Sequence, residues 1–122
     1  MRNDTKRSIG FSPWVTNVWD VDDPTVKKKI GLFAGTPDAV TWSGSAERDI
    51  ASTARASRLG ILEAIVDHLQ CGYVVQGEHM RNGDLAFILR CFLGSRRFYV
   101  KLKFVEIDGT ERMHVFSAHL DR

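Results

Sequence analysis

Polar and apolar side chains alternate in the segment RRFYVKLKF, which runs from Arg96 to Phe104. In a β-strand, this alternation places three cations and a phenol on one face and only apolar side chains on the other. Cations that lie close together repel one another, so such a face favours an anion, most simply a phosphodiester backbone. An alternating strand is also typical of a surface that only meets solvent, and the pattern alone does not decide between the two. The polar residues are Arg97, Tyr99, Lys101 and Lys103.

Histidines near this segment supply groups that cleavage of RNA without a metal ion requires. The reaction needs a base that takes the 2′-hydroxyl proton, an acid that protonates the leaving 5′-oxygen, and cations that stabilise the charge on phosphorus. The residues that we expect to be catalytic are His119, Tyr99 and His79. The residues that we expect to bind RNA phosphate are Lys101, Arg90, Arg97, Lys103 and Ser117.

The pairing of the last two expected strands decides whether these residues meet. Asp108-Gly109 lies between two alternating segments and indicates a hairpin turn. A two-residue turn would place His119 among apolar side chains, whereas a three-residue loop with Gly109 in the left-handed conformation buries more apolar surface. We therefore expect the three-residue loop, which turns His114 inward. It brings four polar residues to one face: Tyr99, Lys101, Ser117 and His119.

Asn82-Gly83 indicates a second hairpin, between two further alternating segments. A two-residue turn there places His79 and Arg90 on the same side of the sheet. Whether that side is also the side of Tyr99 is not fixed by the pattern.

The first half of the chain carries helix signals. A capping residue followed by proline occurs twice, at Ser12 and at Asp23. The first of these helices is amphipathic and has Trp14 and Trp19 on its apolar face. The expected helices cover residues 11–22, 23–35, 45–60 and 61–72.

From Tyr73 onward the apolar period changes to two, which predicts three or four antiparallel strands. The fold class is therefore α+β, with N-terminal helices followed by a C-terminal antiparallel β-meander. The length of 122 residues and the hydrophobic content of 43% fit a single domain. We expect its first residues, 1–10, to be frayed.

Composition excludes several classes of protein. No apolar run approaches the ~20 residues of a membrane span, and the N-terminus lacks the apolar stretch of a secretory signal, so we expect a cytoplasmic protein. Cys71 and Cys91 have no ligand-like or paired spacing, and we expect reduced, buried thiols, with no metal and no cofactor. The formal charge of +2 does not by itself indicate a nucleic-acid-binding protein.

Several segments resemble the MqsR-type ribonuclease toxins of bacterial toxin–antitoxin pairs, which are relatives of the RelE-like toxins. The resemblance covers residues 25–119, and we expect the toxin-like core to span residues 25–120. Residues 11–22 would form an additional N-terminal helix. The stretch CGYVVQGEH replaces the family's Phe-Tyr-Lys-Ser, and Leu89-Arg90 replaces its Gln-Asp. The similar segments are TVKKKIGLFAG, DIASTARASRLG, FYVKLKF and HVFSAH.

This resemblance implies a RelE-like fold, endonucleolytic cleavage of mRNA by 2′-hydroxyl attack, and inhibition by a cognate antitoxin. It places Tyr99 on the family's active-site tyrosine, His119 on its basic residue near the C-terminus, and Lys101 on its strand lysine. The substitution of His79 and Arg90 for the missing family residues is our own inference.

Two other functions remain open. A non-catalytic protein-binding module on the same fold, such as a phage-encoded inhibitor or an inactive toxin homologue, would use Trp14 and Trp19 if their side chains are exposed. A structural homo-oligomer that pairs edge strands is the third interpretation.

Overall fold

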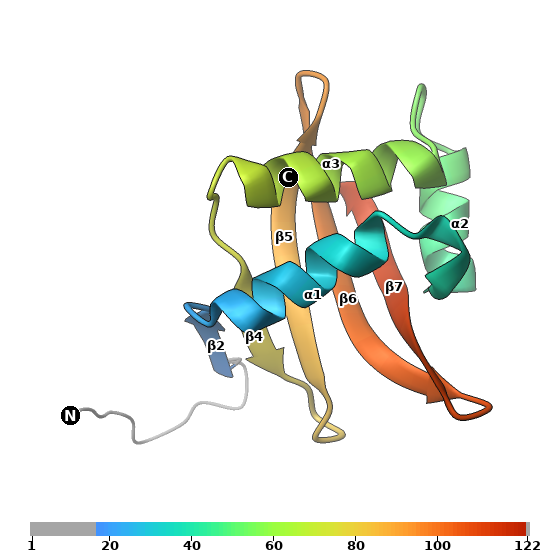
Figure 1. Ribbon diagram of the computed structural model, residues 1–122. Helices are drawn as coiled ribbons and strands as arrows, with labels where there is room; N and C mark the ends of the chain where they lie inside the picture. The colour runs from blue at the N-terminus through green and yellow to red at the C-terminus, as the bar shows by residue number, and fades with distance from the viewer. Residues whose placement is uncertain (1–16, 122) are drawn as a thin grey trace.

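The computed structural model describes residues 17–121, which form three α-helices and a six-stranded sheet in the order β2-β4-β5-β6-β7-β3 (Figure 1). Every strand pair is antiparallel except that of β3 with β7. The α+β class is therefore confirmed. The helices are α1 (Pro24–Ala34), α2 (Gly44–Ala51) and α3 (Arg58–Gln70), and the strands are β2 (Asn17–Asp20), β3 (Val40–Trp42), β4 (Gln76–His79), β5 (Leu85–Leu93), β6 (Arg96–Ile107) and β7 (Thr110–Leu120).

Two strands come from the half of the chain that we expected to be helical. β2 pairs with β4, and β3 pairs with β7, so each lies at one end of the C-terminal meander (Figure 1). β3 consists of a β-branched pair and a tryptophan, residue types that favour strands. The prediction that helices precede the whole sheet is wrong in this respect.

The predicted amphipathic helix over residues 11–22 is wrong for residues 17–20, which form β2. The indole of Trp19 covers Gly77 of β4, where a Cβ atom would lie only 2.6 Å from the ring. The same indole packs on the imidazole of His79, with ring centroids 4.9 Å apart. Contacts across the sheet thus outweigh the helical spacing of the apolar residues. The predictions for residues 1–10 and for Ser12, Pro13 and Trp14 lie outside the described residues.

α1 begins and ends where its local signals predict. The Asp23 carboxylate accepts a hydrogen bond from the Thr25 N–H at 2.9 Å, Pro24 is the first helical residue, and Gly35 follows the last one. These signals need no distant contact, because a capping side chain and a proline act on adjacent backbone.

The predicted helix over residues 45–60 is instead most of α2, a non-helical segment and the first turn of α3. Ser43 caps α2 and Ser57 caps α3, with hydrogen bonds of 3.0 and 2.9 Å to the third residue beyond each. Arg55 lies between the two helices, and its φ of 62° is incompatible with a continuous helix. Leu59-Gly60 therefore lies in the first turn of α3 and does not end a helix.

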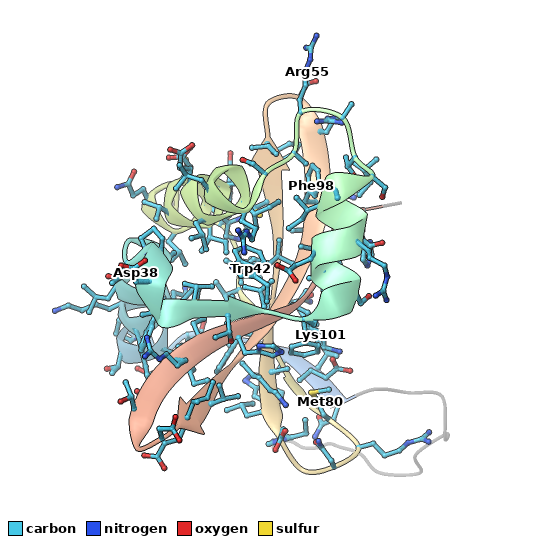
Figure 2. The ribbon with its side chains drawn as sticks, turned by 90° about the vertical axis from the view of Figure 1, so that its right-hand side faces the viewer. Asp38, Trp42, Arg55, Met80, Phe98 and Lys101 are labelled. Atoms are coloured by element: carbon cyan, nitrogen blue, oxygen red, sulfur yellow. The ribbon has the colours of Figure 1, made fainter. Side chains whose placement is uncertain are left out.

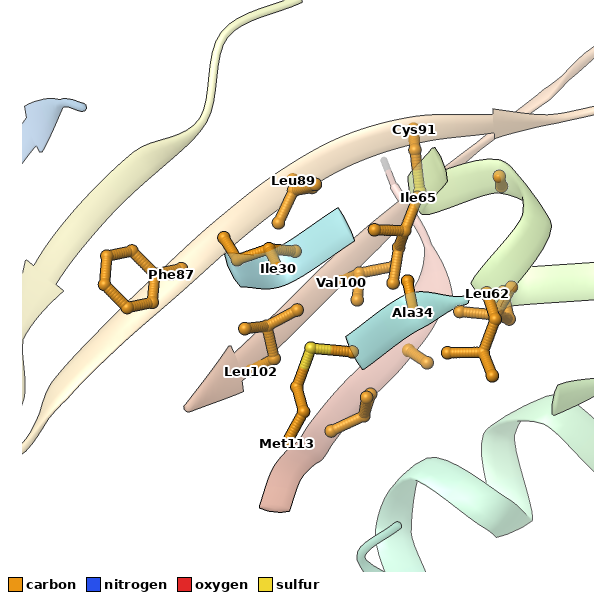
Figure 3. Packing of buried hydrophobic residues seen from close by; sticks show 14 of the residues in the cluster. Ile30, Ala34, Leu62, Ile65, Phe87, Leu89, Cys91, Val100, Leu102 and Met113 are labelled. Atoms are coloured by element: carbon orange, nitrogen blue, oxygen red, sulfur yellow. The ribbon is translucent and has the colours of Figure 1, made fainter. Parts of the chain in front are cut away.

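The core lies between the helices and one face of the sheet (Figure 3). The side chains of Ile30 from α1 and Ile65 from α3 are fully buried against those of Leu89 and Val100 from the sheet. Cys91 is also buried, and burial raises the pKa of its thiol to about 12. Cys71 is exposed at the end of α3, so its predicted burial is wrong, because the helix ends before the chain reaches the sheet.

The last hairpin turns with two residues, so the predicted three-residue loop is wrong. Ile107 pairs with Thr110, and Asp108 and Gly109 have φ of 51° and 77°, which is typical of a type I′ turn. The twist of this turn matches that of the two strands, which explains why it forms.

Next to the turn, β7 has the orientation opposite to the predicted one. Met113 and Val115 are fully buried on the core side. His114 lies on the other side, where its Nδ1 is 2.7 Å from the Thr41 hydroxyl. The predicted inward position of His114 is therefore wrong.

A β-bulge in β7 then restores the predicted orientation of the side chains farther along the strand. Leu102 pairs with Val115 and Lys101 with Ser117, so Phe116 is an extra residue without a partner in β6. The Phe116 carbonyl accepts a hydrogen bond from the Ser43 hydroxyl at 3.1 Å, which joins the bulge to the start of α2. Beyond the bulge, Lys101 pairs with Ser117 and Tyr99 with His119, so these four residues share one face as predicted, although the three-residue loop would have placed Ser117 opposite Tyr99.

None of the helices between residues 17 and 121 is long and apolar enough to cross a membrane.

Deletion of Phe116 should cost little more stability than removal of its side chain. Without the extra residue, Leu102–Val115 and Lys101–Ser117 become consecutive pairs of a regular ladder, so Ala118 stays on the core side and His119 on the opposite side. Phe116→Ala should lower the free energy of unfolding by about 1 kcal/mol, and the deletion should lower it by about 2 kcal/mol, because it also removes the hydrogen bond from Ser43. Thermal unfolding followed by circular dichroism compares the two variants, and a far larger loss of stability in the deletion variant would contradict this description of the bulge.

Candidate functional site

The side of the sheet that faces away from α1 and α3 carries the predicted polar residues, and we call it the open face. Strand alternation and the observed register place Lys101 on this face, whereas Phe98 of the same strand points into the core (Figure 2). The residues of the open face used below are Gln76, Glu78, Ile88, Arg90, Phe92, Arg97, Tyr99, Lys101, Lys103, His114, Phe116, Ser117 and His119.

Tyr99 and His119 are stacked on the open face. Their ring centroids lie 5.3 Å apart with an angle of 15° between the planes, and the Arg90 guanidinium lies 5.3 Å from the centre of the tyrosine ring. The Nδ1 of His119 is 3.0 Å from the Leu120 carbonyl, which can only accept a hydrogen bond. When Nδ1–H donates to that carbonyl, the neutral imidazole has its lone pair at Nε2, where it can accept a proton.

Lys101 forms an ion pair with Glu78, a residue that the sequence reasoning missed. Only 17% of the lysine side chain and 10% of the glutamate side chain are exposed. A single glutamate in a strand carries no signal of its own, and the turn assumed at Asn82-Gly83 gave the wrong strand register. The structure thus adds a carboxylate beside the predicted phosphate-binding lysine.

His79 does not join the other predicted catalytic residues. His79 pairs with Leu85, so the loop between β4 and β5 has five residues instead of two. It is closed by hydrogen bonds between Met80 and Asp84 and between Asn82 and Asp84. The loop is longer than predicted by an odd number of residues, and each added residue reverses the face on which a strand side chain lies. His79 therefore lies on the face opposite Arg90, and the prediction that they share a side is wrong.

Each predicted cation of the open face has a carboxylate partner. The distances are 2.9 Å from Lys103 to Asp84, 2.9 Å from Arg97 to Asp121 and 3.3 Å from Arg90 to Asp121. The hydrogen bond and charge of Lys103 lower the pKa of the Asp84 carboxyl. With the Lys101–Glu78 pair, four cations face three carboxylates, which leaves one positive charge in excess.

Comparison of the chain with protein-family models, curated proteins and solved structures gave no match. Among residues 17–121, no group of three or more His, Cys, Asp or Glu side chains is placed to hold a metal ion. The functional argument therefore depends on the side chains of the open face.

Glu78 and Lys101 should depend on each other for stability. Glu78→Met or Lys101→Met leaves one charge poorly solvated and should cost about 3 kcal/mol in the free energy of unfolding, whereas the double variant should recover most of this loss. Urea denaturation of the four proteins gives the coupling energy. A double variant that is as unstable as the sum of the two single variants would show that the pair is not coupled.

His68 should make stability depend on pH. Its side chain is buried, its Nε2 is 2.7 Å from the Val74 carbonyl, and burial lowers its pKa from the ordinary 6.5. The unfolded chain therefore binds a proton more readily, so stability is complete above about pH 6.5 and falls as the pH drops below that value.

His68→Gln keeps an N–H for the Val74 carbonyl and removes the titrating group. The melting temperature of wild type should fall more than that of the variant between about pH 7 and pH 5. Equal falls would mean that the loss of stability comes from other groups.

Proposed function

We propose that this protein is a metal-independent endoribonuclease toxin that cleaves mRNA in the cytoplasm and is neutralised by a cognate antitoxin. The observation that carries the proposal is the stacked pair of Tyr99 and His119, with Arg90 beside it, on the sheet face opposite α1 and α3. The resemblance of residues 25–119 to MqsR-type toxins supports the same activity. We extend the proposal to a RelE-like core over residues 25–120, to which β2 adds a strand.

His119 is the proton acceptor in the proposed reaction. Its Nε2 takes the proton of the RNA 2′-hydroxyl, the 2′-oxygen attacks phosphorus to form a 2′,3′-cyclic phosphate, and the 5′-oxygen leaves with a proton from Tyr99 or water. Arg90 and Lys101 stabilise the negative charge that develops on phosphorus. His79 has no part in this scheme, because it lies on the opposite face.

A second function is favoured by the ion pairs. Since every predicted cation already has a carboxylate partner, phosphate must compete with Glu78, Asp84 and Asp121 for them. The same face, close to neutral, suits a non-catalytic protein-binding module, such as a phage-encoded inhibitor or an inactive toxin homologue.

His119→Ala should lower the rate of RNA cleavage by ~10²-fold or more while RNA affinity changes little, because the substitution removes a proton-transfer group. Cleavage of a labelled RNA and its binding are measured with purified protein that is free of antitoxin. His114→Gln is the matched control, since His114 lies on the same strand and face but contacts Thr41. A wild-type protein that cuts no RNA, or a His119→Ala variant that cuts as fast as wild type, would replace the proposal with the protein-binding function.

A further inference from the structure

Part of β5 has a free edge although it is an interior strand. β4 pairs with β5 from Gln76 opposite Ile88 to His79 opposite Leu85, and it extends no farther. Within residues 17–121, Leu89–Leu93 therefore has β6 on one side and no strand on the other. Figure 1 shows this end of β5 continuing past α3 into the hairpin with β6.

The backbone of Arg90 and Phe92 points to the free side. Leu93 pairs with Arg96 across a two-residue turn, so Leu93, Cys91 and Leu89 direct their N–H and C=O groups toward β6. Arg90 and Phe92 alternate with these residues and therefore direct their N–H and C=O groups away from β6. No backbone hydrogen bond to these groups of Arg90 or Phe92 comes from residues 17–121.

The segment that precedes β4 is held away from this edge. The Val74 carbonyl lies 2.7 Å from Nε2 of His68 in α3, and the Val75 carbonyl accepts a hydrogen bond from the Val21 N–H at 2.8 Å. The Val75 bond continues the pairing with β2, and the Val74 carbonyl, which would face β5, is engaged by His68, so residues 73–75 do not extend the pairing of β4 along β5.

A pocket of about 320 Å³ lies beside the free edge. Its rim is apolar, with the side chains of Tyr73, Val74 and Phe92 each about half exposed. Arg90 and Arg97 share the single carboxylate of Asp121, so the pocket has one positive charge in excess. The lining residues are His68, Tyr73, Val74, Gln76, Ile88, Arg90, Phe92 and Arg97.

From this geometry we infer that an extended segment of a partner protein adds to β5 as a strand, with an acidic side chain at Arg90 and an apolar side chain in the pocket. Strand addition supplies hydrogen bonds to the free backbone groups, and the pocket selects side chains on one face of the segment. A second copy of this chain fits less well, because it would bring its own arginines to the edge. The inference uses the strand edge and does not rest on the ribonuclease proposal.

The probe is a fluorescent heptapeptide, Thr-Val-Thr-Glu-Thr-Val-Thr, whose binding is measured by anisotropy with the full chain. It should bind ~10-fold or more tightly than the same peptide with Lys in place of Glu, because the charge at Arg90 is reversed. Phe92→Lys should weaken binding ~10-fold, since a lysine at an edge opposes strand addition and the apolar rim is lost. Leu85→Lys is the matched control, because Leu85 is an exposed apolar residue of β5 whose position is already paired with β4.

Amide hydrogen exchange by NMR locates the binding. The Arg90 and Phe92 amides should exchange faster than that of Cys91 in the free protein, and the peptide should slow them. The inference fails if the peptide does not bind, if both peptides bind equally, or if Leu85→Lys weakens binding as much as Phe92→Lys. Protection of these amides in a dimer of the free protein would assign the edge to a second copy of the chain. Protection by a short oligouridylate, but not by the peptide, would assign the edge to RNA. Either result overturns the inference.

Discussion

One extra residue in β7 determines which side chains share the open face. Without the bulge at Phe116, the two-residue turn at Asp108-Gly109 would pair apolar with polar positions along the rest of the hairpin. With it, residues near the turn and residues far from it can both direct their apolar side chains to the core. The stacking of Tyr99 on His119 follows from this shift, and Ser43 at the start of α2 helps to hold it in place.

The open face combines reactive groups with little net charge. Four cations and three carboxylates nearly cancel, and the chain as a whole has a formal charge of +2. Long-range attraction of a polyanion is therefore weak, and recognition must depend on contacts made at short range. Partly buried pairs such as Lys101–Glu78 also fix the positions of the side chains before any ligand arrives.

Sequence signals that act on adjacent backbone predicted the structure better than signals that depend on contacts between residues far apart in the chain. The ends of α1 followed from Asp23 and Gly35, which act on adjacent backbone. The shared face of Tyr99 and His119 was predicted correctly but from the wrong turn, because burial of apolar surface requires that orientation whether a loop or a bulge provides it. The short strand β2 and the partner of Lys101 could not be predicted, since each depends on β4, whose register the Asn82-Gly83 signal did not fix.

The five-residue loop between β4 and β5 gives this fold a simple route to new chemistry. Side chains of β4 alternate between the two faces, so a change in loop length that moved His79 opposite Ala86 would place an imidazole beside Lys101 in place of the Glu78 carboxylate. β2 would move together with β4, because the Trp19 indole leaves no room for a Cβ atom at the position that faces it. Divergent descendants of such a scaffold can therefore differ in acid–base groups through changes in length alone, without any substitution in the sheet.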